Sequence, residues 1–244
     1  MAGGPRVRLD QALAGRGLAP SRARAQALIA AGLVVVDGQP ALGPDQLVEP
    51  ASTLEVRGSG RYVSRGGEKL APAIASFGLR VAGRTAVDVG ASTGGFTDVL
   101  LQAGASHVIA VDVGYGQLDW RLRNDPRVSV LERVNIRELE SLPRPADLAV
   151  VDVSFISLRL VLPRMASLLE RPADVVALVK PQFEVGKGRV GKGGVVRDPD
   201  QHREVLDQLA VFARSLGFEL KGETPSPIAG RRGNREFFLW LGVG

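Results

Sequence analysis

The sequence predicts an α/β fold in which helices cover a mostly parallel sheet, preceded by a small α+β domain. Three observations support this prediction. From residue 66 onward, short apolar runs alternate with amphipathic segments, as in repeated βαβ units. A glycine-rich turn follows the first of these runs, where α/β sheets bind ligands. The first 60 residues instead contain two short helical segments and an Asp37-Gly38 hairpin turn.

The stretch at residues 85–97, TAVDVGASTGGFT, predicts a strand, a glycine loop and a helix that begins near Gly95. The glycine spacing differs from the G-x-G-x-x-G of dinucleotide-binding proteins. Asp88, two residues before Gly90, would also repel a pyrophosphate at the start of the helix. A ligand with ammonium and sulfonium groups and no phosphate suits the site. We therefore expect S-adenosylmethionine as the cofactor.

Composition narrows the classes of protein that the chain can be. It is 45% hydrophobic and 23% charged, and no apolar run approaches the roughly 18 residues that cross a bilayer. The residues after Met1 lack the apolar core of a signal peptide. There is no cysteine, and His107 and His202 are the two histidines, so we expect neither disulfides nor a metal site. These features favour a cytoplasmic protein, not bound to membranes, and we expect a monomer.

Basic residues are concentrated near the N-terminus, where residues 1–65 hold eight arginines against five acidic residues. We expect helices at 8–17 and 21–31 and a strand at 33–36. Arg22 and Arg24 lie at the start of the second helix, where the helix dipole disfavours a cation. A bound phosphate backbone would offset that cost.

The pattern R-L-D-x-x-L…S-R-x-x-A-x-x-L-I-x-x-G-x-V-x-V-D-G covers roughly residues 6–57. It resembles the alpha-L type RNA-binding domain shared by a small-subunit ribosomal protein, pseudouridine synthases and tyrosyl-tRNA synthetases. The resemblance implies that Arg8 and Arg22 contact RNA, with Arg24 as a further candidate. We divide the chain into an RNA-binding domain at 1–60, a linker at 61–65 and a second domain at 66–244.

The second domain is expected to contain seven strands with interleaved helices. The strands are expected at 86–89, 107–111, 128–131, 147–153, 174–179, 218–223 and 235–241, and the helices at 66–77, 95–103, 158–169 and 199–216. Asp112 ends the second strand, where a carboxylate can accept hydrogen bonds from both ribose hydroxyls; the alternative is an ordinary turn aspartate. Asn135 follows the third strand and is placed near an adenine edge.

Two charged residues end neighbouring apolar strands. Asp152 lies near the end of the run at 147–153, and Lys180 follows the run at 174–179. A charge in such a position is costly unless it faces the ligand crevice, although a structural ion pair would also explain it. The segment 186–197, GKGRVGKGGVVR, has five glycines and four cations and no acid. We interpret it as a mobile clamp over an anionic substrate rather than a plain linker.

The order Lys69, Asp152, Lys180, Glu236 completes the pattern, with D-V-S-F-I-S-L, L-V-K-P-Q-F-E and S-P-I…G-N-x-E around the last three. This pattern resembles the FtsJ-type RNA ribose 2′-O-methyltransferases. With the N-terminal domain it is similar to the TlyA family, often called hemolysin A. The resemblance implies a class I, Rossmann-like methyltransferase domain of seven strands. It also implies rRNA within ribosomal subunits as the partner and a cytidine 2′-hydroxyl as the target, with the large subunit favoured and the small subunit a further candidate.

The expected chemistry assigns a role to each of these four residues. A ribose hydroxyl is a weak acid, so its proton must be accepted as the oxygen attacks the methyl group. Lys180 is our candidate base, Asp152 and Glu236 would orient the lysines, and Lys69 would steer the hydroxyl. The sequence leaves open which lysine takes the proton.

Further residues are expected to bind the cofactor and RNA. The expected cofactor contacts are Asp88, Gly90, Ser92, Thr93, Gly94, Gly95, Phe96, Thr97, Asp112, Asn135, Asp152 and Phe155. The expected RNA contacts are Arg8, Arg22, Arg24, Arg65, Lys187, Arg189 and Lys192. Two alternatives stay open: an RNA-binding protein without catalysis, and a hemolysin-type membrane-active protein, for which the sequence offers no amphipathic or apolar membrane segment.

Overall fold

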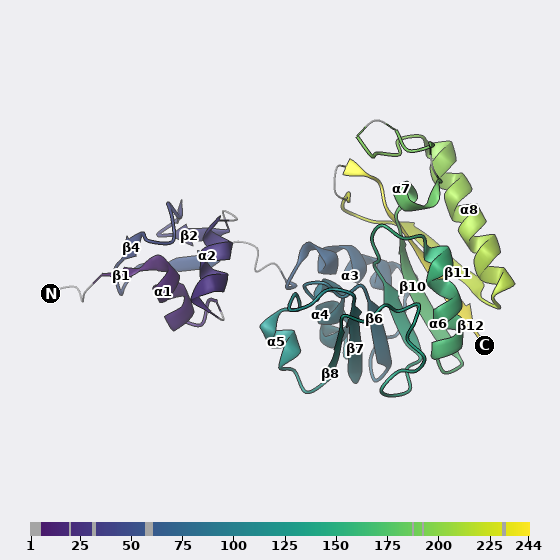
Figure 1. Ribbon diagram of the computed structural model, residues 1–244, viewed down its shortest axis with the longest axis horizontal. Coiled ribbons are helices and arrows are strands. Elements are labelled where there is room, and N and C mark those ends of the chain that lie inside the picture. The colour runs from purple at the N-terminus through teal and green to yellow at the C-terminus, as the bar shows by residue number, and fades with distance from the viewer. Residues whose placement is uncertain are drawn as a thin grey trace. The chain divides into compact units, whose positions relative to one another are not determined.

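The computed structural model describes residues 6–19, 21–30, 33–56, 61–186, 188–191, 193–230 and 233–244. The chain divides into two compact units, residues 1–60 and 61–244 (Figure 1). Residues 61–65, the expected linker, belong to the second unit. Tyr62 is 8% exposed and packs in an apolar cluster with Leu70. Ser64 caps the helix that begins at Arg65 by accepting a hydrogen bond from Gly66 N.

The first unit packs two helices against short antiparallel strands. Its elements are β1 (Val7–Arg8), α1 (Leu9–Gly15), α2 (Arg22–Ala30), β2 (Val34–Val36), β3 (Gln39–Pro40), β4 (Leu47–Val48) and β5 (Leu54–Val56). β2 lies between β3 and β5, and β1 pairs with β4. Asp37 and Gly38 both have positive φ, 50° and 82°, which confirms the predicted hairpin turn. Leu9, Leu13 and Val34 are fully buried in the core of this unit.

The second unit is a seven-stranded sheet with helices on both faces (Figure 1), which confirms the predicted fold class. The strand order is β11-β12-β10-β9-β6-β7-β8; the last five in this order are parallel, and β12 is antiparallel to both of its neighbours. The strands are β6 (Thr85–Val89), β7 (His107–Asp112), β8 (Val128–Glu132), β9 (Leu148–Val151), β10 (Ala173–Val179), β11 (Glu219–Pro225) and β12 (Phe237–Val243). The helices are α3 (Arg65–Phe77), α4 (Gly95–Gln102), α5 (Trp120–Arg123), η1 (Leu158–Leu160), α6 (Leu162–Leu168), α7 (Pro181–Glu184) and α8 (Pro199–Ser215).

Alternating side chains of the strands build one core on each face of the sheet. On β6, Val87 and Val89 enter a cluster that α6 and α8 complete, whereas Ala86 enters a cluster completed by α3 and α4. Burial on both faces explains why these strands read as continuous apolar runs in the sequence.

Some boundaries differ from the sequence-based expectation. The helix expected at 158–169 is a 3₁₀ turn, η1, followed by α6. Glu236 lies one residue before β12 rather than within the last strand. The four-residue helices α5 and α7 were not predicted, because a single turn is too short to show a helical period.

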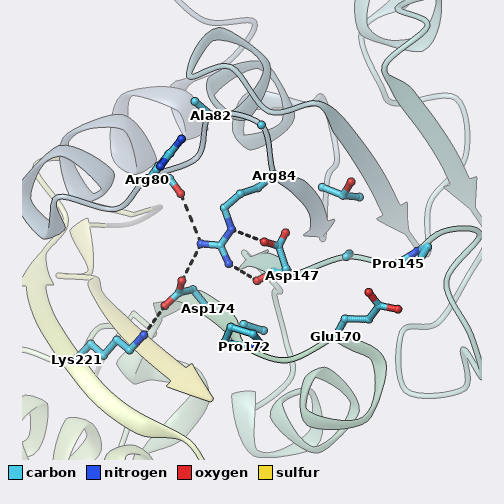
Figure 2. Close-up of a pocket in the computed structure, with 13 residues that line it drawn as sticks. Arg80, Ala82, Arg84, Pro145, Asp147, Glu170, Pro172, Asp174 and Lys221 are labelled. Atoms are coloured by element: carbon cyan, nitrogen blue, oxygen red, sulfur yellow. Dashed lines mark hydrogen bonds and ion pairs between the residues drawn. The ribbon is translucent and has the colours of Figure 1, made fainter. Parts of the chain in front are cut away.

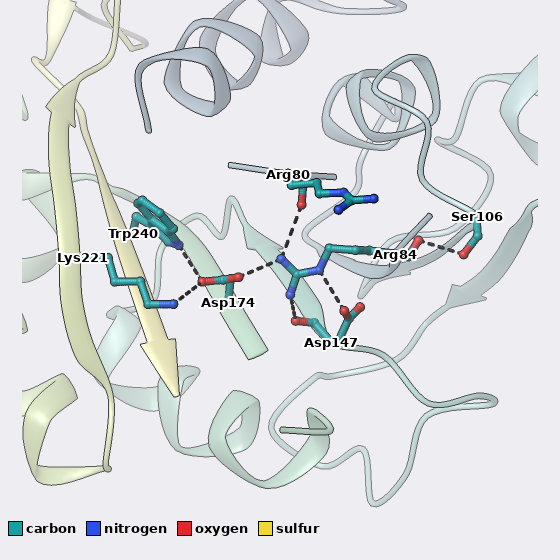
Figure 3. Close-up of polar contacts among 7 residues, drawn as sticks. All are labelled: Arg80, Arg84, Ser106, Asp147, Asp174, Lys221 and Trp240. Atoms are coloured by element: carbon teal, nitrogen blue, oxygen red, sulfur yellow. Dashed lines mark hydrogen bonds and ion pairs between the residues drawn. The ribbon is translucent and has the colours of Figure 1, made fainter. Parts of the chain in front are cut away.

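A network of ion pairs and hydrogen bonds links five neighbouring strands at the amino-terminal edge of the parallel sheet (Figure 3). Arg84 Nε lies 2.8 Å from Asp147 Oδ2, and Arg84 Nη1 lies 2.7 Å from Asp174 Oδ2. Asp174 Oδ1 also accepts hydrogen bonds from Lys221 Nζ at 3.0 Å and Trp240 Nε1 at 2.7 Å. The network forms part of the wall of a groove of about 790 Å³ (Figure 2). Because Arg84 precedes β6 and its partners lie at the starts of β9 and β10, the network fixes the strand ends.

Replacing Arg84 with alanine is expected to lower the free energy of unfolding of the second unit by about 2 kcal/mol, since two carboxylates lose their shared cation. The side chain of Arg84 is 16% exposed, so solvent screens the pairs in part. Both tryptophans, Trp120 and Trp240, lie in this unit, so fluorescence-detected urea unfolding measures it selectively. Arg80→Ala is the matched control, because its carbonyl rather than its guanidinium contacts Arg84. Equal destabilisation by the two variants would contradict the assignment.

Candidate active site

A cavity of about 850 Å³ opens at the opposite, carboxyl-terminal edge of the sheet. Its lining comes from α3, the loops after β6, β9 and β10, and the segment before β12. All four residues of the predicted set, Lys69, Asp152, Lys180 and Glu236, line this cavity. The structure thus brings together side chains that lie far apart in the sequence.

The first pair in the cavity joins Lys180 to Asp152. β9 ends at Val151 and β10 at Val179, so both side chains follow the ends of adjacent parallel strands. Lys180 Nζ lies 2.5 Å from Asp152 Oδ1 and donates a hydrogen bond to Ser154 Oγ at 2.9 Å. The two side chains are 10% and 22% exposed. The ammonium is therefore held by one charged and one neutral oxygen at the cavity wall.

The second pair joins Lys69 on α3 to Glu236. Lys69 Nζ lies 2.6 Å from Glu236 Oε2, and the side chains are 13% and 3% exposed. An ion pair that only stabilises the sheet need not lie near a cavity for substrate, and the Arg84–Asp174 pair lies at the opposite, amino-terminal edge. Here both lysine–carboxylate pairs face the same cavity, where an attacking hydroxyl and its proton acceptor can meet.

The glycine loop after β6 forms one wall of the cavity. Gly90 has φ +85°, and a Cβ there would lie 2.5 Å from the backbone oxygen of Asp152. A Cβ on Gly95 would lie 2.2 Å from Ser64 Oγ and 2.9 Å from Gly67 N. Glycine therefore lets the loop close against the segment after β9 and lets α4 pack against α3. Of the other predicted cofactor contacts, four more line the cavity: Ser92, Thr93, Phe96 and Phe155.

Asp88 lies beneath the glycine loop and does not line the cavity. It is fully buried, and its Oδ2 accepts a hydrogen bond from Thr97 Oγ1 at 2.6 Å. Burial raises the pKa of Asp88 to about 7, and the nearby Asp152 charge adds to the rise, while the Thr97 hydrogen bond opposes it. Thr97 and Gly94 are buried too. These residues hold the first turn of α4 against β6, and direct contact between them and a cofactor stays a prediction.

Asp112 and Asn135 are both engaged in local hydrogen bonds. Asp112 Oδ2 accepts from Ser92 N at 2.8 Å, and its Oδ1 accepts from Gly114 N at 2.7 Å. Asn135 Nδ2 donates to Glu138 Oε1 at 2.8 Å. Asp112 thereby fixes the glycine loop to the end of β7, and each of its oxygens keeps acceptor capacity for a further hydroxyl.

The predicted RNA-binding arginines of the first unit share one buried carboxylate. Asp10 is fully buried; it lies 3.1 Å from Arg8 Nε and 2.8 Å from Arg22 Nε, and it accepts from Gln26 Nε2 at 2.8 Å. The hydrogen bond from Arg8 holds the pKa of Asp10 well below its usual range, with Arg22 and Gln26 contributing. Asp10 therefore offsets the cost of Arg22 at the helix start, which the sequence argument had assigned to a bound phosphate. Arg24 is exposed.

Of the other predicted RNA contacts, Arg65 lines the cavity and donates to the backbone oxygen of Ala229 at 3.2 Å. Arg189 makes two hydrogen bonds to Glu204, at 2.9 and 2.6 Å. Lys187 and Lys192 lie outside the described residues.

Three residues near the site were not singled out from the sequence. Ser154 holds Lys180, as described above. Asn234 is 2% exposed and contacts the end of the glycine-rich segment 186–197. Its Oδ1 accepts a hydrogen bond from Val196 N and its Nδ2 donates to Gly194 O, both at 3.0 Å. Glu184 accepts hydrogen bonds from Ser157 and Leu158 in the segment after β9. All three fall within the sequence strings that resemble the family, but no periodicity or spacing marks them.

Within the described parts of the chain, no group of three or more His, Cys, Asp or Glu side chains is arranged to hold a metal ion. No helix among the described residues is long and apolar enough to cross a membrane.

Comparison with known proteins identifies the family. Residues 62–243 match the family described as FtsJ-like methyltransferase, and residues 7–54 match the S4 domain. The 16S/23S rRNA (cytidine-2′-O)-methyltransferase TlyA of Mycobacterium tuberculosis is 52% identical over 240 residues, covering 97% of this chain and 90% of that protein. The putative rRNA methyltransferase YqxC of Bacillus subtilis is 47% identical, covering 97% and 87%. A solved structure of a putative hemolysin from Streptococcus thermophilus has a TM-score of 0.76 at 44% identity, covering 98% of this chain and 89% of that one. The chain belongs to the TlyA family of FtsJ-like methyltransferases and carries an N-terminal S4 domain.

Proposed function

We propose that this protein is an S-adenosylmethionine-dependent rRNA methyltransferase that acts on a cytidine ribose 2′-hydroxyl. The observation that carries the proposal is the placement of two lysine–carboxylate pairs, Lys69 with Glu236 and Lys180 with Asp152, around one cavity. The M. tuberculosis relative matches nearly the whole chain, and its name supports an rRNA cytidine as the substrate.

The cavity wall fits the cofactor. Gly90 lets the loop close against the segment after β9 and so shapes this wall, and Asp112, which accepts from the backbone of the lining residue Ser92, places beside the wall a carboxylate that disfavours a phosphate ligand. Gly90, Ser92, Thr93 and Phe96 would hold the cofactor there. When bound, S-adenosylmethionine supplies an activated methyl group on a sulfonium centre.

Residues of the chain then accept the proton that the hydroxyl releases. Lys180, when neutral, can accept that proton at Nζ, and Asp152 stabilises the resulting ammonium at 2.5 Å. Ser154 can donate to the neutral amine or accept from the ammonium, so it keeps Nζ in place in both states. Lys69, fixed by Glu236, supplies a positive charge toward the developing oxyanion.

The arginines support binding of an rRNA. Asp10 fixes Arg8 and Arg22 as a pair whose remaining N–H groups can bind phosphate oxygens. Arg65 places a further cation at the cavity. Such a substrate places the enzyme in the cytoplasm, and we expect it to act as a monomer.

The test is to incubate the purified protein with labelled S-adenosylmethionine and separated ribosomal subunits, and to map any methylated ribose. We expect one methylated cytidine in large-subunit rRNA; labelling of small-subunit rRNA in addition would extend the substrate. Binding of rRNA without labelling would support the non-catalytic alternative. Lysis of red cells without labelling would support the membrane-active one.

A further inference from the structure

Glu184 is a carboxylate beside the candidate active site that the proposed chemistry does not use. It is the last residue of α7, the single turn that directly follows Lys180. Its Oε2 accepts a hydrogen bond from Ser157 Oγ at 2.6 Å, and its Oε1 accepts from Leu158 N at 2.8 Å. Both oxygens are therefore engaged by the segment that follows β9. Glu184 is half-buried and does not line the cavity.

The two segments that Glu184 joins carry the Asp152–Lys180 pair. Residues 152–158 follow β9 and residues 180–184 follow β10, and these strands are adjacent and parallel. A second contact joins the same segments, because the rings of Phe155 and Phe183 have centroids 5.2 Å apart. Asp152 at the start of the segment pairs with Lys180, and Ser157 and Leu158 at its end bond to Glu184. The segment is therefore held at both ends.

The segment that Glu184 holds is strained at Phe155. This residue has φ +65°, a conformation that non-glycine residues seldom adopt, and it is 90% exposed at the cavity. Such a conformation persists when surrounding contacts impose it. The bonds to Ser157 and Leu158 are contacts of this kind. Capping of η1 alone does not require Glu184, since Ser157 Oγ already accepts from Arg159 N at 3.1 Å.

We propose that Glu184 is a positioning residue for methyl transfer: it holds residues 152–158 so that Asp152 and Ser154 meet Lys180 Nζ and Phe155 stays at the cavity. Glu184 acts through the segment, because its own oxygens contact Ser157 and Leu158. The inference rests on the proposed function for its kinetic consequence. Its structural consequence, a less ordered segment when Glu184 is removed, is independent of any substrate.

The first measurement is amide hydrogen exchange of the full chain, which needs no activity. In Glu184→Ala we expect faster exchange in peptides that cover residues 152–160, by about tenfold, with β6 and β7 unchanged. Glu170→Ala is the matched control, since this exposed glutamate lies at the opposite edge of the sheet. Unchanged exchange in residues 152–160 of Glu184→Ala would overturn the proposal.

The second measurement is methyl transfer to rRNA. We expect kcat of Glu184→Ala to fall by about 10- to 100-fold with the cofactor Kd changed less than about threefold, because small misplacements of reacting groups have effects of this size. Glu184→Gln should recover much of the rate, since its amide can accept from Leu158 N and donate to Ser157 Oγ. Wild-type activity in Glu184→Ala, or equal losses in the alanine and glutamine variants, would overturn the proposal. Failure of the wild-type protein to label rRNA would instead reject the proposed function and leave the exchange result standing.

Discussion

Replacing Lys180 with alanine is expected to lower methyl transfer by about 10²- to 10⁴-fold, the usual contribution of a general acid or base. Lys180 Nζ lies between Asp152 and Ser154 at the cavity wall, and an alanine leaves no amine there to accept the hydroxyl proton. The measurement is single-turnover transfer of labelled methyl groups to rRNA, with cofactor binding and urea unfolding measured in parallel. We expect the second unit to stay folded, and we expect Lys69→Ala, Asp152→Ala and Glu236→Ala to lose most of the activity as well.

Arginine substitutions distinguish a base from a cation at the two lysines. Arginine keeps its proton in proteins, so Lys180→Arg should be nearly as inactive as Lys180→Ala if Lys180 is the base. Lys69→Arg should retain more activity than Lys69→Ala if Lys69 supplies only positive charge. Lys221→Ala is the control, because Lys221 pairs with Asp174 at the opposite edge of the sheet. Near-full activity of Lys180→Ala would refute the proposed site.

The sequence predicted the sheet and two of the four charged residues of the cavity for one physical reason. Strands buried on both faces leave long apolar runs, so a charge at the end of such a run must face solvent or a ligand. Asp152 and Lys180 satisfy this rule, and the parallel pairing of β9 and β10 places them side by side. Lys69 and Glu236 lie on a helix and before an antiparallel strand, and the resemblance to a family was needed to select them.

Contacts across the sheet edges could not be predicted, because they depend on which chain segments lie opposite one another. Arg84 contacts Asp147 and Asp174 because the order of the strands places β9 and β10 near the start of β6. Glu184 contacts Ser157 because the segments after β9 and β10 lie side by side. The direction in which a single side chain points also could not be predicted from the sequence. Asp88 follows a buried valine, and no sequence pattern indicates that its carboxylate turns under α4 to Thr97.

Replacing Asp88 with asparagine is expected to remove a pH dependence from the stability of the second unit. The folded-state pKa of Asp88 is raised by burial from 3.8 to about 7, so the native state holds this proton more tightly than the unfolded chain. Its contribution to stability is complete below about pH 4 and is lost as pH rises through about 7. The difference corresponds to roughly 4 kcal/mol, because one pKa unit equals about 1.4 kcal/mol. Asparagine is neutral and can still accept the Thr97 hydrogen bond.

The measurement is urea unfolding, followed by tryptophan fluorescence, at pH 5 and pH 8.5. The stability of Asp88→Asn relative to wild type should be higher at pH 8.5 than at pH 5, while groups common to both proteins cancel in the comparison. Thr97→Val provides a second check, since removing the hydrogen bond that lowers the pKa should move the transition to higher pH. Parallel pH profiles for wild type and Asp88→Asn would show that the pKa of Asp88 is the same in the folded and unfolded states, and would contradict the prediction. The cofactor Kd of the same variant separates two roles: an unchanged value assigns Asp88 to holding α4, and a large loss assigns its charge to the ligand, as the sequence first indicated.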